Sequence, residues 1–313
     1  MREQSNFPKL KSKAILSPMS GVTDVAFRAL AKKYGAGLTY TEFVSGAAIV
    51  RNNKTSLRML KIAPSEKPVA VQLFGGNVNE VVEAAKLFED QFDVIDINCG
   101  CPAWKVIKIG AGSELLKKPE GIAKFVNKLA SAVNKPVTIK IRTGIDKNHI
   151  NAVEVAKKAE DAGAAAIAVH GRTREQGYSG VSDWNVIKKV KEAVNIPVIG
   201  NGDVNSPEVF KQKLEESGVD YIMIARAAMT YPYIFQQIND YLKKGSYERK
   251  NQMELFLEYL LLAKKYEIPY PAIRHHAIKF SRGIVGGGKL RQEILKFKDI
   301  NSLRNLIEKN IAL

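Results

Sequence analysis

One cysteine stands where it can move a proton. Cys101 lies in the segment 98–102 (NCGCP), just after an apolar run at 94–98, and its glycine and proline favour a tight loop. A thiol with an ordinary pKa near ~8.5 is mostly protonated at pH 7, so Cys101 can act as a general acid. The alternatives are an inert buried thiol, more plausible for Cys99, and a metal site. We expect no metal, because C-x-C supplies two ligands and the four histidines add no second Cys/His cluster.

A second candidate is Lys140, which interrupts the apolar run 137–141 (VTIKI). A lysine that points inward there is costly unless an anion pairs with it or it loses its proton. The residues leave three interpretations open. Lys140 is a buried ion pair with Asp96 or Glu42, a Schiff-base nucleophile, or the cation that neutralises an electron-rich cofactor ring. In the last case the ring edge is hydrogen-bonded by Gln72, Asn98 and His170.

These residues sit in a regular alternation of short β-rich runs and amphipathic helical runs. Apolar strands that alternate with helices predict a parallel sheet covered on its faces, and eight such units suit a closed (β/α)8 TIM barrel. The rival is an open doubly wound sheet, but 17–21 (SPMSG) is not the glycine-rich fingerprint that usually follows its first strand. The predicted strands are 13–17, 37–41, 69–74, 94–98, 137–141, 166–170, 197–200 and 221–225, and the helices include 78–88, 119–133, 151–162, 184–193 and 207–217.

Nearly every predicted strand ends in a polar or ionisable residue. Active sites of TIM barrels lie at the carboxyl ends of the strands, so these ends predict one polar pocket. After strands seven and eight, Gly202 permits close backbone approach and Arg226 adds a permanent charge, as in a phosphate site. An ordinary turn is the alternative for 201–203 (NGD). The polar strand ends are Ser20, Glu42, Gln72, Asn98, Lys140, Arg142, His170, Arg172, Asn201, Asp203 and Arg226.

After the predicted barrel, the alternation of strands and helices stops. Helical patterns at 253–266, 273–282 and 303–310, with a flexible connection at 283–289, predict a small all-helical domain over 241–313 after a barrel domain over 1–240. The formal net charge is +16, and the region 241–313 holds 15 Lys and Arg against 7 Asp and Glu. A sequence pI near 9.6 points to a polyanionic partner.

Composition excludes several classes of protein. Hydrophobic residues make up 45% and charged residues 26%, which is typical of a globular domain. No apolar run approaches the ~20 residues of a membrane span, and the polar start of the chain is no secretory signal. Two cysteines are too few for a disulfide framework. We therefore expect a cytoplasmic protein with reduced thiols. We also expect a monomer.

Taken together, the motifs resemble those of the tRNA-dihydrouridine synthases. The runs N-x-G-C-P-x-x-K-V, from Asn98, and H-G-R-T-R, from His170, are the most specific. Small departures exist: Cys99 replaces a frequent Met, Ala225 and Tyr231 replace Gly and Asn, and the run 274–279 matches the basic motif loosely. In chain order the resemblance rests on 17–24 (SPMSGVTD), 41–42 (TE), 71–75 (VQLFG), 96–102 (DINCGCP), 140–142 (KIR), 170–174 (HGRTR), 201–203 (NGD) and 225–228 (ARAA).

The resemblance implies an FMN-binding barrel, a helical tRNA-binding domain, and reduction of tRNA uridines to 5,6-dihydrouridine with NADPH. The flavin N5 would give a hydride to C6 of uracil, and Cys101 would give a proton to C5, with Asn98 between flavin and uracil. FMN would be held by Pro18, Met19, Ser20, Gln72, Lys140, His170, Asn201, Gly202, Asp203, Ala225 and Arg226. Candidate RNA contacts are Lys105, Arg142, Arg172, Arg174, Arg274 and Lys279.

Three other functions remain as alternatives. A flavin barrel dehydrogenase acting on a free pyrimidine needs no basic helical tail, which argues against it. A Schiff-base lyase would use Lys140 and would not be yellow. A non-catalytic RNA-binding protein would not need Cys101, Lys140 and His170 together.

Overall fold

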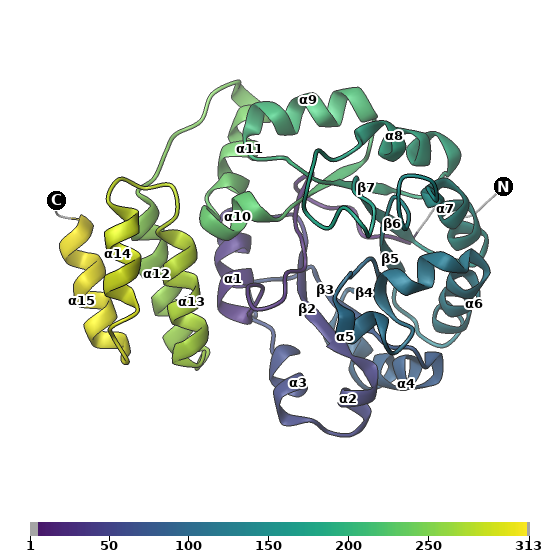
Figure 1. Cartoon of the computed structure of the whole chain (residues 1–313), viewed down its shortest axis with the longest axis horizontal. Helices are drawn as coiled ribbons and strands as arrows, with labels where there is room; N and C mark the ends of the chain where they lie inside the picture. The colour runs from purple at the N-terminus through teal and green to yellow at the C-terminus, as the bar shows by residue number, and fades with distance from the viewer. Residues whose placement is uncertain (1–5, 312–313) are drawn as a thin grey trace.

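The computed structural model describes residues 6–311 and contains one eight-stranded sheet. The strands are β1 (Ala14–Leu16), β2 (Thr39–Ser45), β3 (Val69–Phe74), β4 (Val94–Cys99), β5 (Val137–Arg142), β6 (Ala166–His170), β7 (Val198–Asn201) and β8 (Tyr221–Ile224). Their order is β1-β8-β7-β6-β5-β4-β3-β2, and all neighbours are parallel. Leu16 N donates to Leu38 O (3.0 Å) and Gly37 N to Ala14 O (2.8 Å), which joins the two ends of the sheet. The predicted TIM barrel is confirmed (Figure 1).

Alternation along each strand decides which side chains reach the barrel interior. In β5, Ile139 and Ile141 lie in the large apolar core under the helices, whereas Thr138 and Lys140 face inward. The floor of the barrel is closed by a smaller apolar cluster that includes Ile15, Leu38, Ala70, Val94, Ala168, Ile199 and Met223. Polar inward residues are therefore left at the carboxyl ends of the strands, where the sequence predicted them.

Helices surround the barrel on its outside (Figure 1). Side-chain caps start several of them: Asp24 Oδ1 accepts from Phe27 N at α1, and Ser206 Oγ accepts from Val209 N at α9. The helices are α1 (Val25–Lys33), α2 (Gly46–Val50), α3 (Lys54–Met59), α4 (Val78–Phe88), α5 (Trp104–Ile107), α6 (Pro119–Ala130), α7 (Ala152–Asp161), α8 (Trp184–Ala193), α9 (Pro207–Ser217), α10 (Arg226–Thr230) and α11 (Ile234–Lys244), with 3₁₀ helices η1 (Glu89–Gln91) and η2 (Gly112–Lys117).

Strand β2 departs from its predicted range. The polar pair Thr41-Glu42 was expected to end the strand, but β2 runs on to Ser45 and pairs with β3 beyond the pair. The register shifts between Tyr40 and Phe43, as in a β-bulge. The bulge lets the strand pass two polar residues and still place Val44 in the apolar core.

Four further helices follow the barrel: α12 (Gln252–Lys265), α13 (Tyr270–Phe280), α14 (Gly287–Ile294) and α15 (Ile300–Ile311). The connection predicted as flexible over 283–289 is partly wrong, because α14 starts inside it. Leu290 and Ile294, one helical turn apart, are buried and hold that helix in place. The glycine run concealed the start of α14.

The predicted boundary between the two regions, at residues 240 and 241, falls inside α11. The buried face of α11 packs on α9 and β1 of the barrel. We propose that the helical region begins after the connection 245–251. The ends of the two predicted ranges, 1–5 and 312–313, lie outside the described residues.

The helical region packs directly against the barrel through α12, which contacts α1, and α13, which contacts α10. His276 of α13 is fully buried, stacks on Phe27 of α1 with ring centroids 5.2 Å apart, and lies 3.0 Å from Asp24 Oδ2. Tyr259 of α12 donates from its hydroxyl to the same carboxylate oxygen (3.0 Å). These contacts fix how α13 is rotated at the barrel rim.

Candidate functional site

A cavity of about 1390 Å³ opens at the carboxyl ends of the strands. All eleven residues predicted to hold a cofactor line it, together with Cys101 and Asn98. The polar floor comes from β3 to β8, and one side of the rim comes from α13. The lining includes Pro18, Met19, Ser20, Gln72, Asn98, Cys101, Lys140, Arg142, His170, Arg172, Asn201, Gly202, Asp203, Ala225, Arg226, His275 and Lys279.

The loop that carries Cys101 is held by Asn98. The Asn98 Oδ1 accepts from the backbone N–H groups of Cys101 (2.9 Å) and Gly100 (3.2 Å), and its Nδ2 donates to Gln72 Oε1 (2.8 Å). On the other side, Ser113 donates from both N and Oγ to the Cys101 carbonyl (3.0 and 2.9 Å). A side chain at Gly112 would meet that carbonyl oxygen at 2.7 Å, and its φ of +61° also favours glycine.

The two thiols differ in surroundings. Cys101 is half-buried at the cavity, and burial raises the pKa of its thiol, which outweighs the opposing hydrogen bond from Ala103 and charges of Arg142 and Lys140. The Cys101 thiol is therefore protonated at neutral pH, as a general acid requires. Cys99 is buried in the outer apolar core, which suits an inert thiol. Within residues 6–311, no three His, Cys, Asp or Glu side chains gather closely enough to hold a metal ion.

Lys140 lies at the cavity floor with a neutral partner. Its Nζ donates to Asn201 Oδ1 (3.2 Å). No carboxylate oxygen of residues 6–311 lies within 4.0 Å of this Nζ. Burial and then the Arg142 charge lower the pKa of Lys140 to about 8, against the opposing charge of Asp96. The ion-pair interpretation is thus not what the geometry favours. A group still mostly protonated at pH 7 with unused donors fits an anionic or electron-rich ligand better than a Schiff-base nucleophile.

Asp96 instead forms hydrogen bonds with two neutral side chains in the barrel interior. Its carboxylate accepts from Thr138 Oγ1 (2.5 Å) and from Gln72 Nε2 (2.6 Å). Burial raises the pKa of Asp96 to about 6, in spite of these hydrogen bonds and the charge of Lys140. Because Gln72 donates to Asp96 and accepts from Asn98, its carboxamide has a defined orientation that continues to the Cys101 loop.

His170 stays neutral in this surrounding. Burial first, and then the charges of Lys140, Arg142 and Arg172, lower the pKa of His170 to about 2. A neutral imidazole keeps one donor and one acceptor for a polar ligand. Next to it, an added Cβ at Gly202 would lie 2.1 Å from Ser182 Oγ, and the φ of +136° there suits only glycine. Ser182 therefore packs closely on the Gly202 backbone, and Gly202 lines the cavity.

Asp203 and two arginines form the rim after β7 and β8. Asp203 accepts from Arg172 Nη2 (2.9 Å) and Ser182 N (2.8 Å) through Oδ2, and from Arg226 Nη2 (2.6 Å) through Oδ1. The Arg226 side chain is 54% exposed, so donors remain for an anion such as a phosphate. This places the residues expected for a phosphate group in one cluster.

Two of the predicted RNA contacts, Arg142 and Arg172, are buried. Arg142 is buried and donates to the carbonyls of Gly100, Thr173 and Gly177 at 2.7–2.9 Å. Arg172 is buried as well, with its donors on the loop that follows β6 and on Asp203. Both arginines hold neighbouring loops through these hydrogen bonds, and both line the cavity, so their contact with RNA stays a prediction. The sequence alone does not distinguish an arginine that binds loop carbonyls in the interior from one that is exposed to solvent.

The other four predicted RNA contacts fall in four places. Lys279 lines the cavity that holds Cys101 and Lys140, Lys105 is exposed on α5, and Arg274 is half-buried on α13. Arg174 pairs with Glu114 (2.9 Å) in a separate cavity next to α5. One lining residue was missed. His275 lies four residues before Lys279, so the two share a helix face, and that spacing was the available signal.

Comparisons with known proteins agree with this geometry. The family model of dihydrouridine synthase matches residues 15–312. A probable tRNA-dihydrouridine synthase of Rickettsia conorii is 40% identical over 302 residues, which covers 93% of this chain and 91% of the relative. The tRNA-dihydrouridine synthase B of Pseudomonas aeruginosa is 43% identical over 239 residues, which covers 76% of this chain and 72% of the relative.

Solved structures share the fold at low sequence identity. Histamine dehydrogenase from Rhizobium sp. 4-9 matches with a TM-score of 0.59 and 15% identity, over 81% of this chain and 49% of that one. The structure of TcOYE with pHBA matches with a TM-score of 0.58 and 12% identity, over 85% of this chain and 96% of that one. Among the described helices, none has the length and apolar character that crossing a membrane requires.

Proposed function

Because the chain belongs to the dihydrouridine synthase family, we propose that it reduces uridines of tRNA to 5,6-dihydrouridine. One observation carries the proposal. A protonated thiol, Cys101, and an amine without a carboxylate partner, Lys140, line the same cavity. The thiol can give a proton to the substrate, and the amine can hold a group rich in electrons.

The cofactor in this proposal is a flavin, and we propose FMN. When bound, the flavin supplies the hydride that reduces C6 of the uracil ring. Lys140 would donate hydrogen bonds to the flavin ring through its unused N–H groups. The neutral His170 would offer the ring one hydrogen-bond donor or acceptor. The exposed guanidinium of Arg226 suits the phosphate of FMN, and Gly202 lines the same cavity. The remaining cofactor contacts are proposed for Pro18, Met19, Ser20, Gln72, Asn201, Asp203 and Ala225.

Cys101 would protonate C5 of the uracil. The thiol holds its proton because burial raises its pKa, and the loop that carries it is held by Asn98 and Ser113. A fixed donor contributes typically 10²–10⁴-fold to the rate of a proton transfer. Asn98 lines the cavity beside Cys101 and is proposed to lie between flavin and uracil. Arg142 supports this arrangement from below by binding the Gly100 carbonyl (2.9 Å).

A uracil inside folded RNA cannot reach this cavity unless it is extruded, which costs roughly a few kcal/mol. Cations outside the barrel can offset that cost by binding phosphates. His275 and Lys279 of α13 line the cavity, and Arg274 precedes them on the same helix. A basic helical region at the rim favours a polyanionic substrate over a free pyrimidine. We further propose NADPH as the reductant, and a monomer that acts in the cytoplasm.

The test in cells is a map of dihydrouridine in tRNA with and without this protein. Deletion of its gene should remove dihydrouridine from a defined set of tRNA positions, and the Cys101→Ala variant should fail to restore it while the wild-type chain does. An unchanged map after deletion, with a single copy of such an enzyme in the cell, would overturn the proposal.

A further inference from the structure

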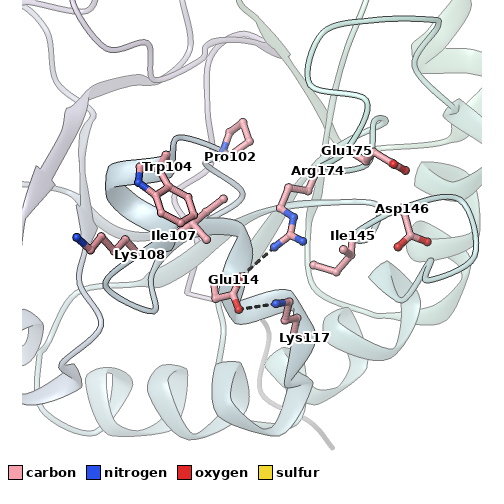
Figure 2. A pocket seen from close by; sticks show the side chains of 10 residues that line it. All are labelled: Pro102, Trp104, Ile107, Lys108, Glu114, Lys117, Ile145, Asp146, Arg174 and Glu175. Atoms are coloured by element: carbon pink, nitrogen blue, oxygen red, sulfur yellow. Dashed lines mark hydrogen bonds and ion pairs between the residues drawn. The ribbon is translucent and has the colours of Figure 1, made fainter.

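A second cavity of about 750 Å³ lies next to the catalytic one and shares Pro102 with it. We call it the Trp104 cavity. Figure 2 shows Trp104 and Ile107 of α5 on one side, Ile145 and Arg174 on the other, and Glu114 and Lys117 at the base. Because Pro102 directly follows Cys101, the two cavities adjoin at the loop that carries the thiol.

Trp104 is unusual for its exposure. It starts α5 and is 72% exposed, whereas the other tryptophan of the chain, Trp184, is 9% exposed. An exposed indole is a platform on which any nucleobase can stack, worth about 1–3 kcal/mol per base. Ile107 and Ile145 add apolar surface in the same cavity. This combination fits a flat, partly apolar group.

The charges of the lining favour a base over a phosphate. Three basic residues, Lys108, Lys117 and Arg174, stand against three acidic ones, Glu114, Asp146 and Glu175. Glu114 binds Lys117 (2.7 Å) and Arg174 (2.9 Å) at once, so two of the cations are already compensated. A phosphate would meet carboxylates there. A neutral base edge, with amino and carbonyl groups, can pair with both kinds of side chain.

We propose that the Trp104 cavity holds the nucleobase of a nucleotide that flanks the target uridine in tRNA. The base stacks on Trp104, and its edge meets Glu114 and Arg174. Lys105, exposed next to Trp104 on α5, is placed for the backbone phosphates outside. The inference rests on the proposed function, because it takes tRNA as the ligand. It adds a site of contact that senses the sequence next to the uridine.

The test uses the flavin-loaded full chain and unmodified tRNA. Trp104→Ala should weaken tRNA binding by about 5- to 100-fold, which corresponds to the stacking of one base. Trp104→Phe, which keeps an aromatic face, should recover most of that loss. Ile109→Ala is the matched control, since Ile109 is 51% exposed on the same segment and lines neither cavity. It should bind tRNA as the wild type does.

Two further measurements separate the alternatives. Binding of tRNA should quench the tryptophan emission of the wild type, and Trp104→Phe should lose that quenching. Wild-type tRNA affinity in Trp104→Ala would overturn the proposal. So would a raised KM for NADPH with unchanged tRNA affinity, which would assign the cavity to the dinucleotide. If the wild type binds tRNA through Trp104 but forms no dihydrouridine, the proposed function fails while the base site stands.

Discussion

His276 Nε2 lies 3.0 Å from Asp24 Oδ2, and this contact joins the helical region to the first helix of the barrel. Asp24 also caps α1 through its other oxygen, with Phe27 N as the donor (2.9 Å). The residue next to His276, His275, lines the catalytic cavity. The contact between His276 and Asp24 therefore holds the helical region on the barrel and positions the neighbouring His275 at the cavity rim.

The first prediction concerns this contact and pH. Burial alone would raise the pKa of Asp24, but the charge and hydrogen bond of His276 and the hydrogen bonds from Phe27 N and the Tyr259 hydroxyl lower it below its usual range. A carboxylate with a lowered folded-state pKa stabilises the fold above its unfolded pKa of ~3.9, and that stability is lost as pH falls through the folded value. Thermal unfolding should show this loss below about pH 4.

The matched variants are Asp24→Asn and Asp24→Ala. Asparagine still caps a helix, so Asp24→Asn removes the charge opposite His276 and leaves the start of α1 intact. We expect Asp24→Asn to lower the unfolding free energy by about 1–3 kcal/mol and to reduce the acid-dependent loss, with a larger loss of stability in Asp24→Ala. Acid-dependent unfolding that is identical in wild type and Asp24→Asn would contradict the assignment.

The second prediction concerns Lys140 and flavin affinity. The pKa of Lys140 is lowered to about 8 by burial and by Arg142, so the free protein loses this positive charge as pH rises through that value. Flavin affinity should therefore be constant near pH 6 to 7 and should decline above about pH 8. Lys140→Met should bind FMN more weakly at every pH and should lack this decline.

The measurement is equilibrium titration of FMN into the stripped protein, followed by flavin fluorescence at several pH values. Lys191→Met serves as control, since Lys191 on α8 pairs with Asp220 (2.7 Å) and does not line the cavity. An affinity profile of Lys140→Met that parallels the wild type would show that Lys140 does not face the flavin.

The third prediction concerns phosphate contacts from α13. Removing one phosphate contact should lower the slope of log Kd against log salt by about 1. We expect that reduction for Lys279→Gln and again for Arg274→Gln, measured by tRNA binding across a salt series. Lys86→Gln on α4, a helix that lies apart from α13 (Figure 1), should leave the slope as it is. Equal slopes in all four proteins would contradict the role of α13.

Much of the barrel is predictable from the sequence because its signals are local. The short continuous apolar runs give β3 and β6 at their observed bounds, and α4, α8 and α9 match as well. The order of polar strand ends then predicts one cavity, since parallel strands of a barrel all end at the same rim. Lys140 and Asn201 come together for that reason, although 61 residues separate them.

Other features depend on contacts that no local pattern records. The continuation of β2 past Glu42 depends on a bulge against β3. The burial of Arg142 depends on three carbonyls from two loops, so its charge alone suggested an exposed residue. His276 reads as part of a basic run, and only the packing of α13 on α1 shows that it is buried against Phe27 and Asp24.

The most direct test of the central claim is a single-turnover reaction with Cys101→Ala. Both wild type and variant are loaded with FMN, reduced with NADPH and mixed with unmodified tRNA, and dihydrouridine is counted against time. We predict that the variant retains the flavin and forms dihydrouridine at least about 100-fold more slowly, because the Cys101 thiol is the proton donor. Dihydrouridine formation at the wild-type rate in Cys101→Ala would contradict the account.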